Sequence, residues 1–216
     1  MKDLMPQRSE SDGNGKPRVI VATYDYRDEQ GDVLYQAVRF FPKDFRQRRP
    51  NGKGGWSWSV KGCRKVPYRL PELLAADPAT TIYKVEGEKD SDRMCEIGLV
   101  ARCNVGGAGK WRREYGEHFR GRNVVVLPDN DDPGRADADQ VASMLYGVAA
   151  SVRIVSLPDL PPKGDVSDWL DGLGEAADPL EHLQEMADNT PLWTPADSAT
   201  SQTGSTAESI PVGTIV

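Results

Sequence analysis

The stretch that decides the fold is NVVVLPDNDDPGRADADQVA, residues 123–142. An apolar run from Val124 to Leu127 leads through a proline into the acidic turn DNDDPG, residues 129–134. After the turn, apolar residues recur with the i, i+3, i+4, i+7 spacing of an amphipathic helix, at Ala138, Val141, Ala142 and Leu145. Carboxylates this close repel one another and raise each other's pKa. A chain tolerates them where a cation sits among them or where the turn is well solvated.

Strand-like and helix-like segments alternate on both sides of this stretch. Strands are expected at residues 81–87, 100–107, 123–129 and 151–159, and helices at 88–99, 111–121, 134–149, 165–173 and 175–188. This alternation predicts an α/β fold in which helices wrap a parallel sheet of about four strands, with right-handed crossovers. In such open sheets ligands gather beyond the carboxyl ends of the strands. Glu86 and Asp129 both fall at such ends.

The segment that precedes the α/β region is β-rich and basic. Its expected elements are strands at residues 18–26 and 33–41, a basic loop at 43–55, a third strand at 56–62 and a short helix at 69–76. We therefore expect a small N-terminal subdomain over residues 17–77 and the α/β domain over residues 78–190. The two ends, residues 1–16 and 191–216, are rich in small polar residues and are predicted to be disordered.

The composition limits the class of protein. The net charge of −6 divides into +6 over residues 1–75 and −12 over residues 76–216. This indicates a basic surface suited to a polyanion and an acidic one suited to metal ions, or else ordinary charged surface. Three cysteines without a CxxC spacing and two histidines make a zinc site unexpected. No apolar run approaches the ~20 residues of a membrane span and no signal peptide is recognisable, so a cytoplasmic location without membrane contact is expected.

Two strand ends carry the candidate chemistry. The first is KVEGEKD, residues 84–90, and the second is LPDNDDPG, residues 127–134. Carboxylate oxygens suit Mg²⁺ or Mn²⁺, and Mg²⁺ often uses one or two carboxylates together with substrate phosphates. Glu86, Asp129 and Asp131 are therefore candidates for metal binding and for phosphoryl-transfer chemistry. The alternative is that the motifs are an ordinary helix start and an Asx-rich turn.

VEGEKD followed by an apolar strand and PDNDDPG resembles the Toprim domain of bacterial and phage-type DNA primases, which topoisomerases and some nucleases share. The resemblance covers residues 80–172 and implies a Rossmann-like sheet wrapped by helices. It implies that Glu86 is the glutamate of the first motif and that Asp129 and Asp131 are the Asp-x-Asp metal pair, which makes these three the catalytic residues. Gly134 matches the small residue that opens the next helix.

Further positions follow from the same resemblance. Asp90 matches the acid that follows the glutamate in primase-type members and is a further expected metal ligand. KGDVSDWL, residues 163–170, resembles the segment after the last Toprim strand in phage and plasmid primase-helicases. This implies metal binding by Asp165 and a phosphate contact by Lys163. Alternatively, Asp165 or Ser167 caps the helix that follows.

The glycine loop NVGGAGKW, residues 104–111, is not a P-loop. Asn104 stands at the first glycine position of that motif, and Trp111 follows the lysine. The glycines allow close approach of the backbone beside the metal site. Lys110 is a candidate contact for a nucleotide or template phosphate.

The N-terminal subdomain carries the candidate nucleic-acid contacts. Between residues 36 and 69, cations outnumber acids and aromatic residues are interleaved with them. Cations bind phosphates and aromatic rings stack on exposed bases. The residues expected to bind nucleic acid are Arg46, Arg48, Arg49, Lys53, Lys61, Arg64 and Lys65. The alternative, favoured for Phe40 and Trp58, is that the aromatic residues form the subdomain core and the charges its solvated face.

The resemblance implies a primase-type nucleotidyltransferase that makes RNA primers on single-stranded DNA with Mg²⁺ or Mn²⁺, in phage or mobile-element DNA replication. Single-stranded DNA and nucleoside triphosphates are the expected partners. The sequence has no counterpart of the zinc ribbon and helicase that accompany many such primases, so a separate zinc-ribbon protein or helicase is a further expected partner. The alternatives are a Toprim nuclease that cleaves DNA phosphodiesters and a non-catalytic accessory protein that binds single-stranded DNA.

Overall fold

A computed structural model of the chain describes residues 10–11, 17–174 and 178–195. The predicted disorder of residues 1–16 and 191–216 falls mainly outside these ranges, although Glu10–Ser11 forms a short strand, β1. In the described ranges, none of the helices has the length and apolar character that crossing a membrane requires.

The N-terminal part is a five-stranded antiparallel sheet in the order β1-β2-β3-β4-β5. The first two predicted strands are confirmed as β2, Pro17–Arg27, and β3, Val33–Phe41, which pair with each other antiparallel. The prediction of a loop over residues 43–55 is wrong for Asp44–Pro50, which forms β4 along the edge of β3, and the expected third strand is reduced to Trp56–Ser57, β5. The polar sequence of β4 hides this strand, because backbone pairing rather than an apolar pattern stabilises it.

The predicted parallel sheet is confirmed. Its strands are β6, Ile82–Lys84, β7, Val100–Arg102, β8, Asn123–Val126, and β9, Ser151–Ile154. All neighbours pair in parallel, in the order β7-β6-β8-β9. The helices are α1, Leu70–Ala75, α2, Glu88–Glu96, the 3-10 helix η1, Arg113–Phe119, α3, Asp132–Leu145, α4, Val166–Gly172, and α5, Pro179–Asn189.

The strand order places a topological switch point between β6 and β8. The chain passes from β6 through α2 to β7 on one side, and from β8 through α3 to β9 on the other. The two crossovers leave a crevice beyond the carboxyl ends of β6 and β8, which is where open α/β sheets bind ligands. Lys84 pairs with Val126 at these ends, so the residues that follow the two strands emerge side by side.

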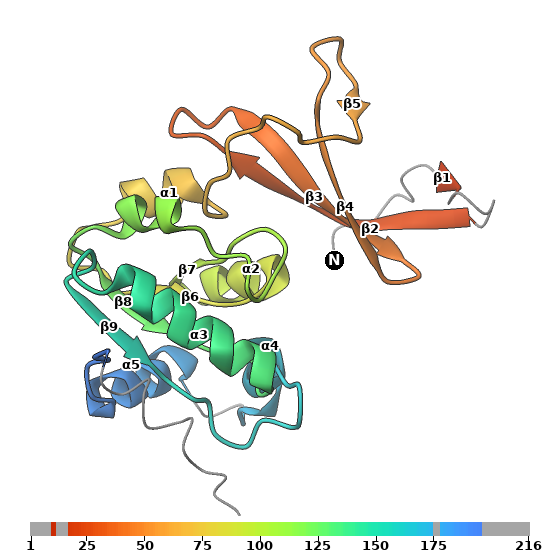
Figure 1. Ribbon diagram of the computed structural model, residues 1–216. Coiled ribbons are helices and arrows are strands. Elements are labelled where there is room, and N and C mark those ends of the chain that lie inside the picture. The colour runs from red at the N-terminus through yellow and green to blue at the C-terminus, as the bar shows by residue number, and fades with distance from the viewer. Residues whose placement is uncertain (1–9, 12–16, 175–177, 196–216) are drawn as a thin grey trace, which may run out of the picture.

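One hydrophobic core joins the two sheets, although the N-terminal sheet projects from the body of the molecule in Figure 1. Tyr26 and Tyr35 are fully buried, and their rings stack with centroids 4.6 Å apart. The Tyr26 hydroxyl donates to Glu88 Oε1 at 2.8 Å, and the Tyr68 amide donates to the Cys103 carbonyl at 2.9 Å. The β-rich sheet is thereby fixed against the parallel sheet.

A buried ion pair lies below the crevice. Lys84 Nζ on β6 contacts Asp137 Oδ2 on α3, and both side chains are 3% exposed. Asp137 Oδ1 also accepts a hydrogen bond from the Gly109 amide at 2.7 Å. The pair therefore links the strand, the helix and the glycine loop at residues 104–111.

Replacing Lys84 with methionine is expected to lower the free energy of unfolding by about 3–5 kcal/mol, because Asp137 then stays buried without a counter-charge. Urea denaturation followed by circular dichroism measures this loss. The double variant Lys84→Met/Asp137→Leu is expected to recover most of it, because no unpaired charge remains buried. A Lys84→Met protein as stable as the wild type would show that the pair does not hold this junction.

Candidate active site at the carboxyl ends of the parallel strands

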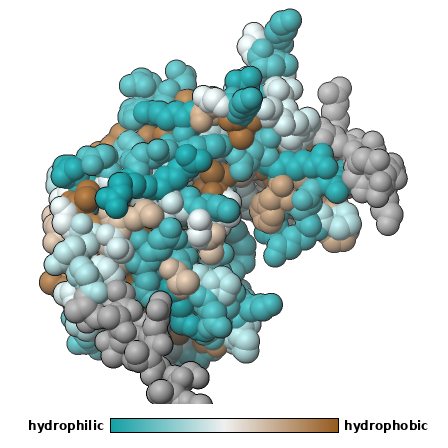
Figure 2. Space-filling model, in the orientation of Figure 1, coloured by the Kyte–Doolittle hydropathy of each residue, from teal (hydrophilic) through white to brown (hydrophobic). Residues whose placement is uncertain are grey.

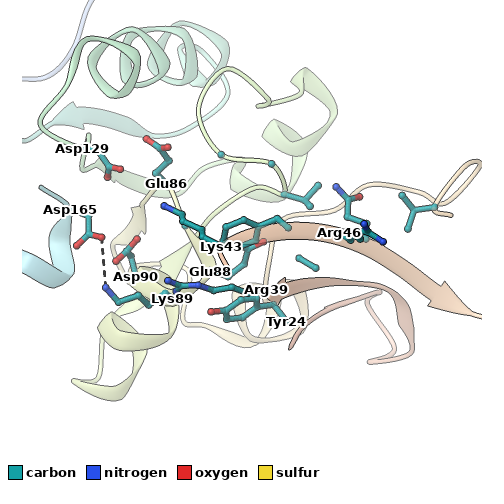
Figure 3. A pocket seen from close by; sticks show the side chains of 18 of the residues that line it. Tyr24, Arg39, Lys43, Arg46, Glu86, Glu88, Lys89, Asp90, Asp129 and Asp165 are labelled. Atoms are coloured by element: carbon teal, nitrogen blue, oxygen red, sulfur yellow. Dashed lines mark ion pairs between the residues drawn. The ribbon is translucent and has the colours of Figure 1, made fainter. Parts of the chain in front are cut away.

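A cavity of about 660 Å³ lies between the two sheets, at the switch point. The parallel-sheet side contributes carboxylates to its lining: Glu86, Glu88, Asp90, Asp129 and Asp165. The N-terminal sheet contributes aromatic and basic side chains: Tyr24, Arg39, Lys43, Phe45, Arg46 and Trp58. The close view in Figure 3 shows Glu86, Asp90, Asp129 and Asp165 on one side of the cavity and the Lys43 side chain reaching toward Glu86 from the other. The cavity thus has an acidic wall and a basic wall.

Glu86 and Asp129 are brought together by the sheet itself. Each lies a short distance beyond the end of its strand, β6 or β8, and the two strands are neighbours. Burial, the charge of Glu86, and then those of Asp90 and Asp165, raise the pKa of the Asp129 carboxyl from 3.8 to about 8. Burial and the neighbouring carboxylates therefore favour the protonated form of Asp129.

Asp90 and Asp165 approach the same cavity from two helix N-termini. Asp90 lies in the first turn of α2, and its Oδ1 accepts a hydrogen bond from the Ser167 hydroxyl. Burial is the main reason that the pKa of Asp90 rises to about 6, and the charge of Asp165 adds to it. Asp165 caps α4 through the Asp168 amide at 2.9 Å, as one of the sequence alternatives predicted, and also pairs with Lys89 at 3.8 Å.

The acidic turn is held by a second loop. The backbone amide of Asn130 donates to the Gly164 carbonyl, and the backbone amide of Lys163 donates to the backbone carbonyl of Asn130, both at 2.9 Å. Asp131 is not among the residues that line the cavity, and it caps α3, where its Oδ1 accepts a hydrogen bond from the Gly134 amide at 2.8 Å. A Cβ at Gly134 would lie 2.6 Å from the Asp129 carbonyl oxygen, so this position requires glycine.

The donor set suits a divalent cation that keeps most of its water. Among the side chains that the structure describes, no group of three or more His, Cys, Asp or Glu is arranged to hold a metal ion by itself. Mg²⁺, however, is usually held by one or two carboxylates plus substrate phosphates. Glu86 and Asp129 supply such a pair, since both line the cavity and lie beyond the ends of neighbouring strands.

The two lysines predicted to contact phosphate do not line the cavity. Lys110 and Lys163 are both exposed, and neither is among the residues that surround the acidic wall. Lys110 follows the glycine loop, in which Gly106 and Gly107 do line the cavity. Gly106 and Gly107 have φ values of 92° and 72°, a left-handed conformation that favours glycine.

The predicted nucleic-acid contacts divide into exposed and engaged residues. Exposed side chains are those of Arg46, Arg49, Lys53, Lys61 and Arg64, although Arg64 pairs with Glu29. Lys65 is half-buried, donates to Gln47 at 2.8 Å and lies 3.9 Å from the Tyr35 ring centroid. Arg48 is 9% exposed and donates to Gln36 Oε1 at 2.7 Å. Only Arg46 of this set lines the cavity.

Sequence reasoning missed the basic wall. Arg39 and Lys43 come from β3 and the β3–β4 turn, and they face the carboxylates only because the N-terminal sheet packs over the switch point. The alternation of β3, in which Ala37 and Arg39 share a face, was the available signal. Glu88 was also missed. It faces the cavity, and burial raises its pKa.

Comparisons with known proteins identify the fold. No family model matches the chain, and no curated protein does. A DNA primase domain from Pseudomonas aeruginosa matches with a TM-score of 0.60 and 19% identity, over 90% of this chain and 59% of that one. A DnaG primase catalytic domain bound to single-stranded DNA matches with a TM-score of 0.57 and 19% identity, over 85% and 58%.

A bacteriophage T7 structure containing the primase domains of two gp4 subunits bound to an RNA/DNA hybrid and dTTP also matches. Its TM-score is 0.53 with 21% identity, over 83% of this chain and 81% of that one. The chain spans 53% to 59% of the bacterial catalytic-core structures of this kind. At these identities the likeness defines the fold, which is that of DNA primase catalytic domains.

Replacing Asp129 with asparagine is expected to stabilise the metal-free protein at pH 8 more than at pH 4.5. The folded state holds the Asp129 proton up to about pH 8, whereas the unfolded state loses it near pH 3.8. The proton's stabilising contribution is therefore present below about pH 4 and is lost as pH rises to about 8. The asparagine side chain does not titrate in this range, so the variant does not lose this contribution to its stability as the pH rises. Melting temperatures of both proteins in a chelator, across this range, measure the difference.

Mg²⁺ provides the control for that comparison. At pH 8 it is expected to raise the melting temperature of the wild-type protein, because a ligand that binds only the folded state stabilises it. The increase should be much smaller for Asp129→Asn. Equal responses of the two proteins to Mg²⁺ would exclude Asp129 as a metal ligand.

Replacing Gly134 with alanine is expected to cost about 1–3 kcal/mol, because the new methyl group meets the backbone of Asp129. The same change should also weaken the Mg²⁺-dependent rise in melting temperature. Gly172→Ala is the matched control, since nothing lies within 4 Å of its Cβ position. If both alanine variants behave alike, close packing at Gly134 does not set the position of Asp129.

Proposed function

We propose that this chain is a primase-type Toprim protein that joins ribonucleotides on single-stranded DNA in a reaction that depends on Mg²⁺ or Mn²⁺. The observation that carries the proposal is the cavity at the switch point, where Glu86 and Asp129 face Arg39 and Lys43. The primase fold supports the same assignment. We further propose that the protein serves DNA replication of a phage or mobile element.

The chemistry is attack by a primer or initiating 3′-hydroxyl on the α-phosphorus of a nucleoside triphosphate, with loss of pyrophosphate. A divalent ion supplies positive charge against the triphosphate and the transferring phosphoryl group. Asp129 would hold that ion, and Glu86 would share it or accept the proton that the hydroxyl loses. Asp90 and Asp165 keep the wall acidic, and Asp131 sets the position of Asp129 by capping α3.

The basic wall complements this arrangement. A nucleoside triphosphate carries more negative charge than one divalent ion neutralises, so it needs cations on the side away from the carboxylates. Lys43 and Arg39 occupy that side of the cavity. The exposed cations of β4 and of the segment after it, including Arg46 and Lys53, extend the positive surface away from the cavity and suit a nucleic-acid backbone.

Primer synthesis is the direct test. The protein is mixed with single-stranded DNA, labelled ribonucleotides and Mg²⁺ or Mn²⁺, and short labelled products are expected. Asp129→Ala and Glu86→Ala are each expected to lower the rate by about 100-fold or more, because each removes charge stabilisation at the reacting phosphate.

Asp132→Asn is the matched control. Asp132 lies in the same acidic turn, but its side chain is 96% exposed and pairs with Arg135. It should synthesise primers at the wild-type rate. Nicked or shortened DNA without primers would replace the proposal by a nuclease. DNA binding without either activity would indicate an accessory protein.

A further inference from the structure

A second cavity, of about 550 Å³, lies between the segment that follows β5 and the start of the 3-10 helix η1. Residues 62–66 line one side of it, and Arg112, Glu114 and His118 line the other. It has Val60 in common with the cavity at the switch point, which lies where Figure 2 shows a hollow between the N-terminal sheet and the body. The five carboxylates of the acidic wall are not part of its lining. The proposed chemistry at the switch point therefore does not use the groups gathered here.

The environment of Lys65 in this second cavity is unlike that of the other lysines that the structure describes. Lys65 is half-buried, its Nζ donates to Gln47 Oε1 on β4 at 2.8 Å, and it lies 3.9 Å from the centroid of the Tyr35 ring on β3. Both of these partners are neutral. Lys84, in contrast, is buried in its ion pair with Asp137. The remaining described lysines are exposed, namely Lys43, Lys53, Lys61, Lys89, Lys110 and Lys163.

This environment favours the neutral amine of Lys65. Burial is the main cause that lowers the pKa of the ammonium group, and the positive charge of Arg112 adds to the lowering, whereas Cys63 acts in the opposite direction. The neutral amine is the form of lysine that attacks an electrophile, so a lysine with a lowered pKa is the better nucleophile at neutral pH. Lys65 therefore has the chemistry of a modification site.

The charge of the second cavity indicates which electrophile it would take. Arg64 and Arg112 line it together with Lys65. Arg112 pairs with Glu114 at 3.4 Å, and Arg64 pairs with Glu29. Three cations thus stand against two carboxylates, which leaves an excess of positive charge. Guanidinium groups bind phosphate well, so an electrophile whose leaving group is phosphate fits this cavity.

We propose that Lys65 is an acylation site whose acyl donor is a small acyl phosphate bound in the second cavity. The amine nitrogen attacks the acyl carbonyl carbon, an amide bond forms, and the bond between that carbon and the phosphate oxygen breaks. Inorganic phosphate leaves beside Arg112, and the proton that the nitrogen loses passes to solvent. The acyl phosphate is the only co-reactant that the step requires.

The modification has a route to the candidate active site through the shared core. Acylation converts the ammonium group near the Tyr35 ring into a neutral amide, which removes the cation–π contact. Tyr35 stacks on Tyr26, whose hydroxyl donates to Glu88 in the lining of the first cavity. Acylation is therefore expected to weaken the attachment of the N-terminal sheet and to slow primer synthesis, an effect that rests on the proposed function.

Acetyl phosphate tests the site directly. The full chain is incubated with acetyl phosphate near neutral pH, and the rate of acetylation at each lysine is measured by mass spectrometry of its peptides. Lys65 is expected to react about threefold faster, or more, than the exposed Lys53 and Lys61 of the same segment, since each unit of pKa changes the neutral fraction about tenfold. With acetic anhydride, which carries no phosphate, this advantage should be smaller.

A matched pair of variants separates the cavity from the surrounding surface. Arg112→Gln is expected to slow acetylation of Lys65 about threefold or more, because it removes both a phosphate contact and a charge that lowers the pKa of Lys65. Arg113→Gln changes the next residue, which is exposed and does not line the second cavity, and should leave the rate unchanged. Neither change should affect Lys53 or Lys61. Melting temperatures establish that both variants are folded.

Two further variants test the consequence of the modification. Lys65→Gln imitates the acetylated side chain and is expected to lower the melting temperature, because the cation–π contact is lost. Lys65→Arg keeps the positive charge and should retain the melting temperature of the wild type. A Lys65→Gln protein as stable as Lys65→Arg would show that the charge at this position does not help to hold Tyr35.

Two results would overturn the acylation site: acetylation of Lys65 no faster than that of Lys53 and Lys61, or equal effects of Arg112→Gln and Arg113→Gln. Neither measurement depends on primer synthesis. Asp129→Ala, which is expected to abolish primer synthesis, should leave the acetylation rate of Lys65 unchanged. A chain that makes no primers but is acetylated at Lys65 in this way would therefore retain the site and lose the proposed function.

Discussion

The structure is organised around a concentration of negative charge at the switch point between β6 and β8. Neighbouring parallel strands must release their chains at the same edge, and here both chains continue into carboxylates, Glu86 and Asp129. Burial and the neighbouring carboxylates raise the pKa of Asp129 to about 8, so keeping this carboxylate ionised costs free energy. A fold keeps such a cost where the charges hold a ligand, in keeping with the general finding that perturbed titrating groups cluster at functional sites.

Hydrogen bonds and close packing of the backbone hold these carboxylates in place against their mutual repulsion. Gly134 lets α3 begin directly against Asp129, and Asp131 caps the same helix. The Asn130 backbone pairs with the loop at residues 160–164, which carries Asp165 to the cavity. The buried ion pair of Lys84 and Asp137 links β6 to α3 and to the glycine loop. The acidic wall is therefore held by backbone hydrogen bonds and close packing, to which the carboxylates of Asp90 and Asp165 add hydrogen bonds of their own.

The N-terminal sheet completes the site by supplying the opposite charge. Its attachment depends on Tyr26, whose hydroxyl reaches Glu88 within the shared core, so the two walls have a fixed relation. Arg48 is a cation of this sheet with a different environment. Its guanidinium packs over the Trp56 and Trp58 rings and is not exposed to solvent. The cations of this sheet therefore have two kinds of partner. Arg39 and Lys43 face the carboxylates across the cavity, whereas Arg48 contacts tryptophan rings.

The sequence by itself determined the α/β class, the four parallel strands and the acids at two strand ends. These features follow from local periodicity and from the rule that parallel strands end together. It did not reveal β4, the basic wall formed by Arg39 and Lys43, or the burial of Arg48. The tertiary structure decided these, because each depends on which strands pair and on contacts between residues far apart in the chain. Asp131 is an example of both. The sequence shows its place in the acidic motif, but only the position of α3 decides that its carboxylate caps the helix.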